Sequence, residues 1–264
     1  MTPISNKSEI RSHTALRGLA ALIVVLVHFR SFFHPSIHPD EVTFFLAKGY
    51  LWVDFFFILS GFVLSYVYGI ERPERRTFRD ITHYLIARFA RIYPLHLISL
   101  IAVFLFFITV PLISWSQNGT FCCVFDGSLR SADSLLANLF LVHAWGMFDW
   151  VTWNFPSWSL SAEFFCYLIF ATLLTMDSGS RKLALIALLC TVLLYYGFHL
   201  ITSGDVDENF RLSVVRATSA FSIGIVLFLG RQTISALPEK CLTHIQITAS
   251  ITLLLALHFG VPDV

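Results

Sequence analysis

The sequence predicts an all-α protein, a polytopic bundle of about seven to eight transmembrane helices. Of its 264 residues, 56% are hydrophobic and only 13% are charged, whereas a soluble domain usually carries about 25% charged residues. The apolar residues gather into runs, most of which reach the roughly 20 residues that a bilayer crossing needs. A net charge of +1 provides no basic footprint for nucleic acid. We therefore expect an integral multi-pass membrane protein whose main surroundings are lipid.

Eight apolar runs account for the expected helices. They fall at about 15–33, 43–69, 92–113, 134–148, 158–176, 183–202, 210–230 and 241–260. The run at 134–148 is short for a crossing, so we expect it to enter the membrane and return, which leaves seven full crossings. No repeat, linker or low-complexity stretch divides the chain, and residues 1–264 are expected to form a single membrane-embedded domain.

Basic residues predict the side of the membrane that each loop takes. Lys7 and Arg11 precede the first run, and six arginines follow the second: Arg72, Arg75, Arg76, Arg79, Arg88 and Arg91. Cytoplasmic loops carry an excess of Lys and Arg, so we expect the N-terminus and this connection to be cytoplasmic. A re-entrant 134–148 also places the acidic loop at 205–208 outside.

The first apolar run carries two ionisable side chains on one face. Arg17 and His28 are eleven residues apart, which brings a helix back almost to the same face roughly 16 Å further along its axis. Ionisable groups inside a membrane span are costly and by default indicate a functional site. The alternative for Arg17 is that it snorkels from the helix end to the interface.

Two later runs each carry a carboxylate. Asp54 shares a helix face with small and polar residues that must meet protein or water: Tyr50, Gly61, Ser65 and Tyr68. Glu163 lies near the start of the fifth run. The expected topology places both carboxylates and His28 in the outer half to middle of the membrane, which favours proton handling. The alternatives are an Asp54 that holds helices together and a Glu163 stabilised by the helix dipole.

A basic amphipathic segment at 77–94 leads into the third run and carries Arg88 and Arg91 at i and i+3. The planar fork of arginine suits phosphate. A topology-setting basic face is the alternative. We expect these arginines on the cytoplasmic side, away from Glu163. No spacing of His, Cys, Asp or Glu predicts a metal site.

Four motifs together resemble the acyltransferase-3 family of membrane O-acyltransferases, which modify bacterial surface carbohydrates. They are, in chain order, Arg17-x10-His28, the run from Gly49-Tyr-Leu-Trp-Val-Asp54 to Gly61, Arg88-Phe-Ala-Arg91-Ile-Tyr-Pro94, and Trp158-Ser-Leu-Ser-Ala-Glu163. The resemblance covers residues 10–230. Family members usually have more spans, so it implies that the last two or three helices of the family are missing here.

The resemblance implies transfer of an acyl group, often acetyl, from cytoplasmic acyl-CoA to the hydroxyl of a carbohydrate or glycolipid, with no bound cofactor. His28 would be the general base, because its pKa suits proton abstraction near pH 7, with Asp54 and Glu163 as supporting carboxylates. The donor would be bound by Arg17, Arg88 and Arg91. A bacterial inner membrane is the implied location.

Two other classes remain open from the sequence. A polytopic transporter or flippase would also place Asp, Glu, His and Arg within its spans, although no internal symmetry between halves is visible. An inactive, truncated relative of the acyltransferases is the third possibility.

Overall fold

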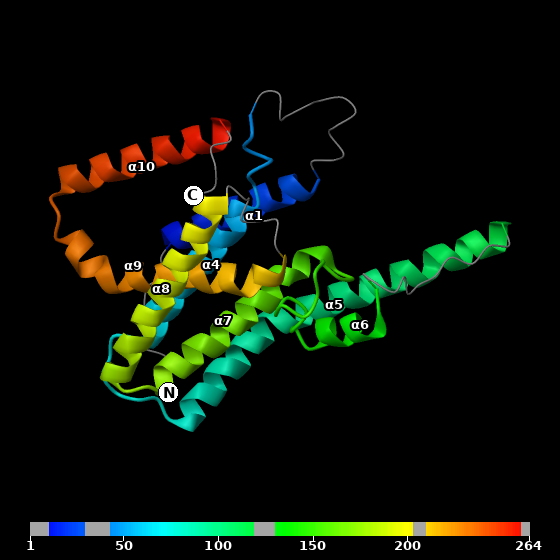
Figure 1. Ribbon diagram of the computed structural model, residues 1–264, viewed down its shortest axis with the longest axis horizontal. Helices are drawn as coiled ribbons and strands as arrows, with labels where there is room; N and C mark the ends of the chain where they lie inside the picture. Colours follow the sequence, from blue (N-terminus) through cyan, green and yellow to red (C-terminus); the bar gives the residue numbers. More distant parts are fainter. Residues whose placement is uncertain (1–10, 30–42, 119–129, 203–209, 260–264) are drawn as a thin grey trace. The chain divides into compact units, whose positions relative to one another are not determined.

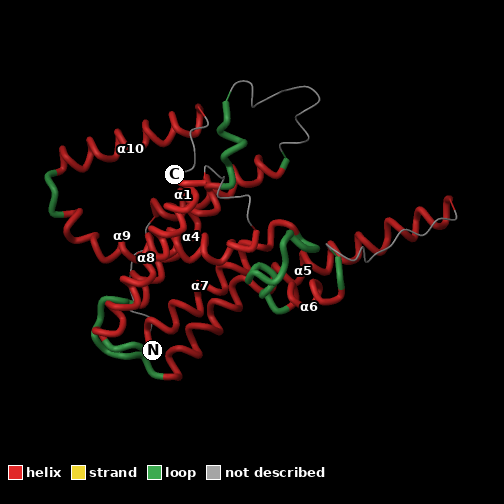
Figure 2. Tube along the Cα trace, in the orientation of Figure 1, coloured by secondary structure: helices red, strands yellow, loops and turns green. Residues whose placement is uncertain are grey.

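The computed structural model describes residues 11–29, 43–118, 130–202 and 210–259. Every regular element within these ranges is a helix, and they contain no strand (Figure 2). The predicted all-α class is therefore confirmed.

Six helices in the described ranges are long and apolar enough to cross a membrane. They are α4 (Leu51–Tyr68), α5 (Phe78–Asn118), α7 (Trp158–Thr175), α8 (Ser178–Thr202), α9 (Ser213–Ser235) and α10 (Glu239–Phe259). The N-terminal helix α1 (Arg11–His28) contains a shorter apolar stretch, Ala15–His28. Many large apolar side chains on these helices are exposed, as lipid contact requires. The chain is an integral multi-pass membrane protein.

The run at 134–148 does not form a crossing helix. It contributes α6 (Ala132–Leu139), which begins at a reciprocal capping box between Ser131 and Ser134. Eight residues extend about 12 Å, against a hydrocarbon thickness of about 30 Å. The backbone then turns through positive φ at Leu141 and Gly146 and reaches the short helix η1 (Phe155–Ser157) before α7. This run is therefore too short in its helical part to cross as a helix, and its re-entrant path stays a prediction.

Helix α5 is continuous over 41 residues, although it contains Pro94 and Pro111. Its length of about 62 Å exceeds one hydrocarbon thickness. The basic segment and the third apolar run are thus parts of one rod, which packs along α7 (Figure 1).

The chain divides into two compact units. The first comprises residues 1–72, 185–207 and 219–264, and the second comprises 73–184 and 208–218. Among the described residues, the first unit contains α1, α4, α10 and most of α8 and α9. The second contains α5, α6, α7, the start of α8 and the first turn of α9.

In the first unit, α4 and α9 touch backbone to backbone. A Cβ atom placed on Gly61 would lie 2.0 Å from the Phe221 carbonyl oxygen, and one on Gly224 would lie 2.0 Å from that of Ile58. Small residues allow such close approach between membrane helices. Beside the crossing, the rings of Phe62 and Phe228 meet edge to face at 5.7 Å.

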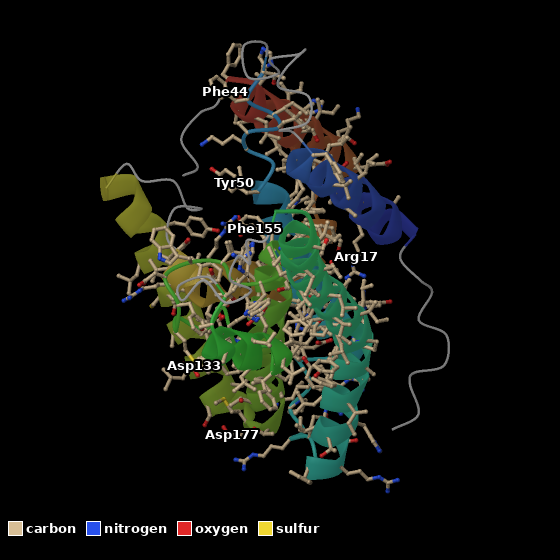
Figure 3. All side chains as sticks on the ribbon, turned by 90° about the vertical axis from the view of Figure 1, so that its right-hand side faces the viewer. Arg17, Phe44, Tyr50, Asp133, Phe155 and Asp177 are labelled. Atoms are coloured by element: carbon tan, nitrogen blue, oxygen red, sulfur yellow. The ribbon has the colours of Figure 1, made fainter. Side chains whose placement is uncertain are left out.

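In the second unit, the junction between α7 and α8 is fixed by polar contacts. The buried Arg181 side chain donates hydrogen bonds to the Leu173 and Met176 carbonyl groups at the end of α7. Asp177, labelled in Figure 3, accepts from the N–H and hydroxyl of Ser180, and these bonds, with nearby Arg75, hold the pKa of its carboxyl at about 2. The connection therefore keeps its charges paired at neutral pH.

We predict that Gly61→Ala lowers the free energy of unfolding by about 1–3 kcal/mol or more, because the new methyl group meets a backbone atom that cannot move aside. Gly18→Ala is the matched control, since nothing lies within 4 Å of a Cβ there, and alanine should stabilise that helix by up to about 1 kcal/mol. Thermal unfolding in detergent measures both. Equal effects at the two positions would contradict the close crossing.

Candidate functional site

His28 and Asp54 lie at the same end of the helix pair α1 and α4 in the first unit. The two helices pack together, and a Cβ on Gly49 would lie 1.9 Å from a methyl carbon of Val27. The last turn of α1 therefore contacts the backbone at Gly49, two residues before α4 begins. His28 is the final residue of α1, and Asp54 lies in the first turn of α4.

The hydrogen bond of the His28 ring favours one tautomer. Its Nδ1 lies 2.7 Å from the Val24 carbonyl oxygen, which can only accept a hydrogen bond. A neutral imidazole that donates through Nδ1 carries its lone pair on Nε2. The side chain is exposed at the end of the helix. The ring thus has the form and the accessibility that a proton acceptor needs.

The other two predicted residues of the first unit are covered to different degrees. Asp54 is buried, as are Gly61 and Ser65 of the same face, so the expectation that this polar stripe meets protein is confirmed there. Arg17 extends from α1 (Figure 3) and is half-buried. A buried carboxylate and a half-buried guanidinium therefore belong to the unit that carries His28.

In the second unit, Glu163 is held by a tyrosine one turn along α7. The Tyr167 hydroxyl donates a hydrogen bond of 2.6 Å to Glu163 Oε1, a length typical of a bond to a charged acceptor. Tyr167 itself is buried, and Glu163 is half-buried. The tyrosine therefore fixes the position of the carboxylate within the helix pair.

Arg88 and Arg91 lie beside this carboxylate, not at a different depth. Phe89 of α5 packs edge to face on Phe164 of α7, with ring centroids 5.9 Å apart. One turn before Arg88 on α5, the Tyr84 hydroxyl donates a hydrogen bond of 3.3 Å to the Tyr167 carbonyl oxygen of α7. The expectation that the arginines and Glu163 are separated in depth is wrong. Because α5 begins at Phe78 and is unbroken, its basic stretch runs alongside the middle of α7.

Arg216 is a candidate that the sequence reasoning missed. It lies in the first turn of α9 and is buried, with its guanidinium carbon 5.4 Å from the centre of the Trp158 ring. Trp158 opens the segment that contains Glu163. Like Arg17, Arg216 is an arginine inside an apolar run, here at 210–230, and such a residue by default indicates a functional site. Its neighbour Arg211 differs, because it forms an exposed ion pair with Asp149.

A buried polar network fixes the loop that leads into α7. His143 Nε2 lies 3.2 Å from the Ser157 hydroxyl, and His96 Nε2 lies 2.8 Å from the Asn138 carbonyl oxygen. Both rings are buried. The absence of metal-ligand spacing predicts packing roles for the histidines outside the first run, and His96 and His143 are hydrogen-bonded within this buried network. Within the described residues, no three His, Cys, Asp or Glu side chains converge as for a metal ion; His34 and His38 lie outside those residues.

These features define an integral membrane protein with ionisable side chains held inside its helical units. The sequence profile of the family described as an acyltransferase domain matches residues 11–262, and the chain belongs to this family. The predicted resemblance is therefore confirmed.

Two curated relatives match parts of the chain. The acyltransferase MdmB of Streptomyces mycarofaciens is 33% identical over 168 residues, which are 61% of this chain and 38% of the relative. Protein 2 in the picA locus of Rhizobium radiobacter is 41% identical over 93 residues, or 35% of this chain and 43% of that protein. The matched segments thus span less than half of either relative. No solved structure matches the chain.

We predict that Arg216→Gln destabilises the protein clearly more than Arg211→Gln does. A desolvated cation over an aromatic ring is worth about 2 kcal/mol, whereas an exposed ion pair contributes about 0–1 kcal/mol. The two arginines lie five residues apart, so Arg211→Gln is a matched control. Thermal unfolding in detergent, followed by tryptophan fluorescence, measures the difference. Equal losses would show that the contact with Trp158 contributes nothing.

Proposed function

We propose that the chain is a membrane O-acyltransferase that moves an acyl group, in the simplest case acetyl, from acyl-CoA to the hydroxyl of a carbohydrate or glycolipid. The observation that carries this proposal is the position of Glu163, bound by Tyr167 on α7, at the level of Arg88 on the adjacent helix α5, with the exposed Arg91 one turn further along α5. Membership of the acyltransferase family and the name of the Streptomyces relative support the reaction class. Residues 1–264 would act as one acyltransferase domain.

His28 is the proposed general base. Attack by a hydroxyl group on a thioester requires an acceptor for the hydroxyl proton, and an imidazole with its lone pair on Nε2 can take it. The hydrogen bond from Nδ1 to the Val24 carbonyl supports this tautomer. Asp54, buried at the same end of the α1–α4 pair, would stabilise the imidazolium that forms.

Arg88 and Arg91 are proposed to bind the phosphates of the acyl donor, with Arg17 as a further cation in the first unit. The arginine fork matches phosphate oxygens. Glu163 next to them would act on the reacting groups and also limit how tightly the anionic donor is held. No metal or other cofactor takes part in the proposed reaction; acyl-CoA is a co-substrate.

The proposed orientation places the N-terminus and the arginine-rich connection after α4 in the cytoplasm, in a bacterial inner membrane. The excess of arginine at 72–79 supports this assignment. Acyl-CoA would then be supplied from the side on which it is made, and the acceptor would be modified on or across the membrane.

We predict that His28→Gln lowers acyl transfer or acyl-CoA hydrolysis by about 10²–10⁴-fold, the usual contribution of a general base. His83→Gln is the matched control, because His83 is also exposed but lies on α5. Release of free CoA by the purified proteins measures the effect. Near-normal turnover in His28→Gln would exclude His28 as the base. Binding and movement of a substrate by the wild type without any CoA release would favour a transporter.

The arginine pair can be tested through donor affinity. Arg88→Ala and Arg91→Ala should each weaken acyl-CoA binding by roughly tenfold or more, as expected for loss of a charge-assisted hydrogen bond. Lysine at either position should restore part of the affinity, because it keeps the charge but loses the fork. Arg79→Ala, on an exposed part of the same helix, should bind normally. Unchanged affinity in both alanine variants would leave the pair with a topological role.

Glu163→Gln should lower turnover without weakening the binding of acyl-CoA, the opposite of what is expected for the arginine variants. Removal of a negative charge beside two arginines should leave acyl-CoA binding intact or tighten it, while turnover falls because the carboxylate no longer acts on the reacting groups. Tyr167→Phe should lower turnover less, since it removes the hydrogen bond of the carboxylate but not the carboxylate. Calorimetric titration and single-turnover rates separate the two quantities. Weakened donor binding in Glu163→Gln would contradict the proposed roles.

A further inference from the structure

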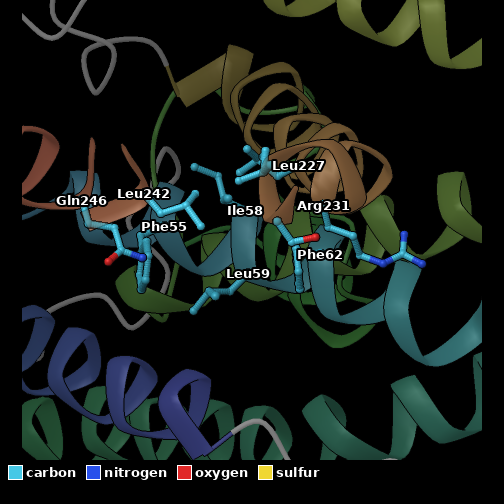
Figure 4. A pocket seen from close by; sticks show the side chains of 10 residues that line it. Phe55, Ile58, Leu59, Phe62, Leu227, Arg231, Leu242 and Gln246 are labelled. Carbon is cyan, nitrogen blue, oxygen red and sulfur yellow. The ribbon is translucent and has the colours of Figure 1, made fainter. Parts of the chain in front are cut away.

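The first unit contains an apolar pocket that none of the proposed catalytic residues lines. It lies among α4, α9 and α10 and has a volume of about 460 Å³ (Figure 4). This is within the range of about 300–1,000 Å³ that ligand pockets usually have. The α4 wall consists of Phe55, Ile58, Leu59 and Phe62, whose spacing places them on one helix face.

The α10 side of this pocket is formed by a helix that is mostly exposed. Helix α10 contributes Leu242 and Gln246, and only 6% of its apolar window is buried within the protein. Most of its large apolar side chains are exposed. In a membrane, lipid chains therefore reach both sides of α10, and the pocket beside it is accessible to them.

One lining residue carries a charge. Arg231 of α9 belongs to the pocket wall, donates one hydrogen bond to the Phe228 carbonyl and another to Glu71, and lies over the Phe228 ring. A guanidinium has five N–H donors. Because its side chain is 31% exposed in the ion pair with Glu71, Arg231 can also receive an anionic group.

We propose that this pocket binds one acyl chain of an anionic membrane phospholipid, with the lipid phosphate at Arg231. An apolar crevice at membrane depth is poorly filled by water, which would find few polar partners there, and a single alkyl chain can lie along the apolar α4 face from Phe55 to Phe62. The charge at one end selects a lipid over a plain hydrocarbon. The site is independent of the proposed acyl transfer, since the lipid is a bound component and not a substrate.

The test is lipid retention by the full chain, purified in detergent from membranes that contain phosphatidylglycerol and phosphatidylcholine. Mass spectrometry of the intact complex counts bound lipid. The wild type should retain phosphatidylglycerol in preference to phosphatidylcholine. Ile58→Trp and Leu242→Trp, which fill the pocket from two different helices, should lose it. Arg231→Gln should reduce the preference by roughly tenfold or more, in line with the loss of a charge-assisted hydrogen bond.

Two variants serve as matched controls. Leu229→Trp adds the same bulk at an exposed position of α9 outside the pocket, and Lys240→Gln removes an exposed positive charge elsewhere in the unit. Both should retain lipid as the wild type does. Size-exclusion chromatography and circular dichroism establish that each variant is folded.

Three results would overturn the proposal. Equal retention in all variants would place the lipid on the general surface of the helices. If inorganic phosphate alone displaced the retained phosphatidylglycerol, the phosphate without an acyl chain would be sufficient for binding at Arg231, and the site would be a free-anion site. A change in the mass of the protein assembly, rather than in bound lipid, on tryptophan substitution would assign the pocket to contact with a second copy of the chain.

Discussion

Charged side chains at membrane depth must be covered by protein, and this constraint governs the arrangement of both units. Glu163 is held by the Tyr167 hydroxyl, Arg216 lies buried against Trp158, and Asp54 is buried on the face of α4 that also carries Gly61. The close approach of α4 and α9 at that glycine shows how such a face is covered: without side-chain bulk between them, the backbones themselves exclude lipid.

The same constraint concentrates opposite charges in the second unit. Arg88 and Glu163 are both half-buried at one level of the α5–α7 pair, and opposite charges that lie near each other lower the cost of placing either in an apolar setting. Their position beside the N-terminal half of α7 gives the proposed reaction a polar region in which an anionic donor can bind next to a carboxylate. His28 and Asp54 provide the corresponding pair of groups within the first unit, at one end of α1 and α4.

The helical class and the spans could be predicted from the sequence because hydropathy records which segments are long enough to cross, and the brevity of α6 follows from the shortness of its run. The level of Arg88 relative to Glu163 could not be predicted from the sequence, because it depends on where α5 begins and on how α5 packs along α7. The bond between Tyr167 and Glu163 follows from their i,i+4 spacing. The position of Arg216 inside an apolar run indicates a functional or structural role, but nothing in the sequence predicts its contact with Trp158.

We propose that the chain consumes acyl-CoA at the arginine-rich side of the membrane, which the proposed orientation assigns to the cytoplasm. The most direct measurement compares sealed vesicles of the two orientations that contain the wild-type chain, with acetyl-CoA added outside and free CoA recorded by a thiol reagent. We predict CoA release from inside-out vesicles, none above background from right-side-out vesicles, and none from inside-out vesicles that carry His28→Gln. Equal release in both orientations, or none from intact inside-out vesicles of the wild type, would contradict the account.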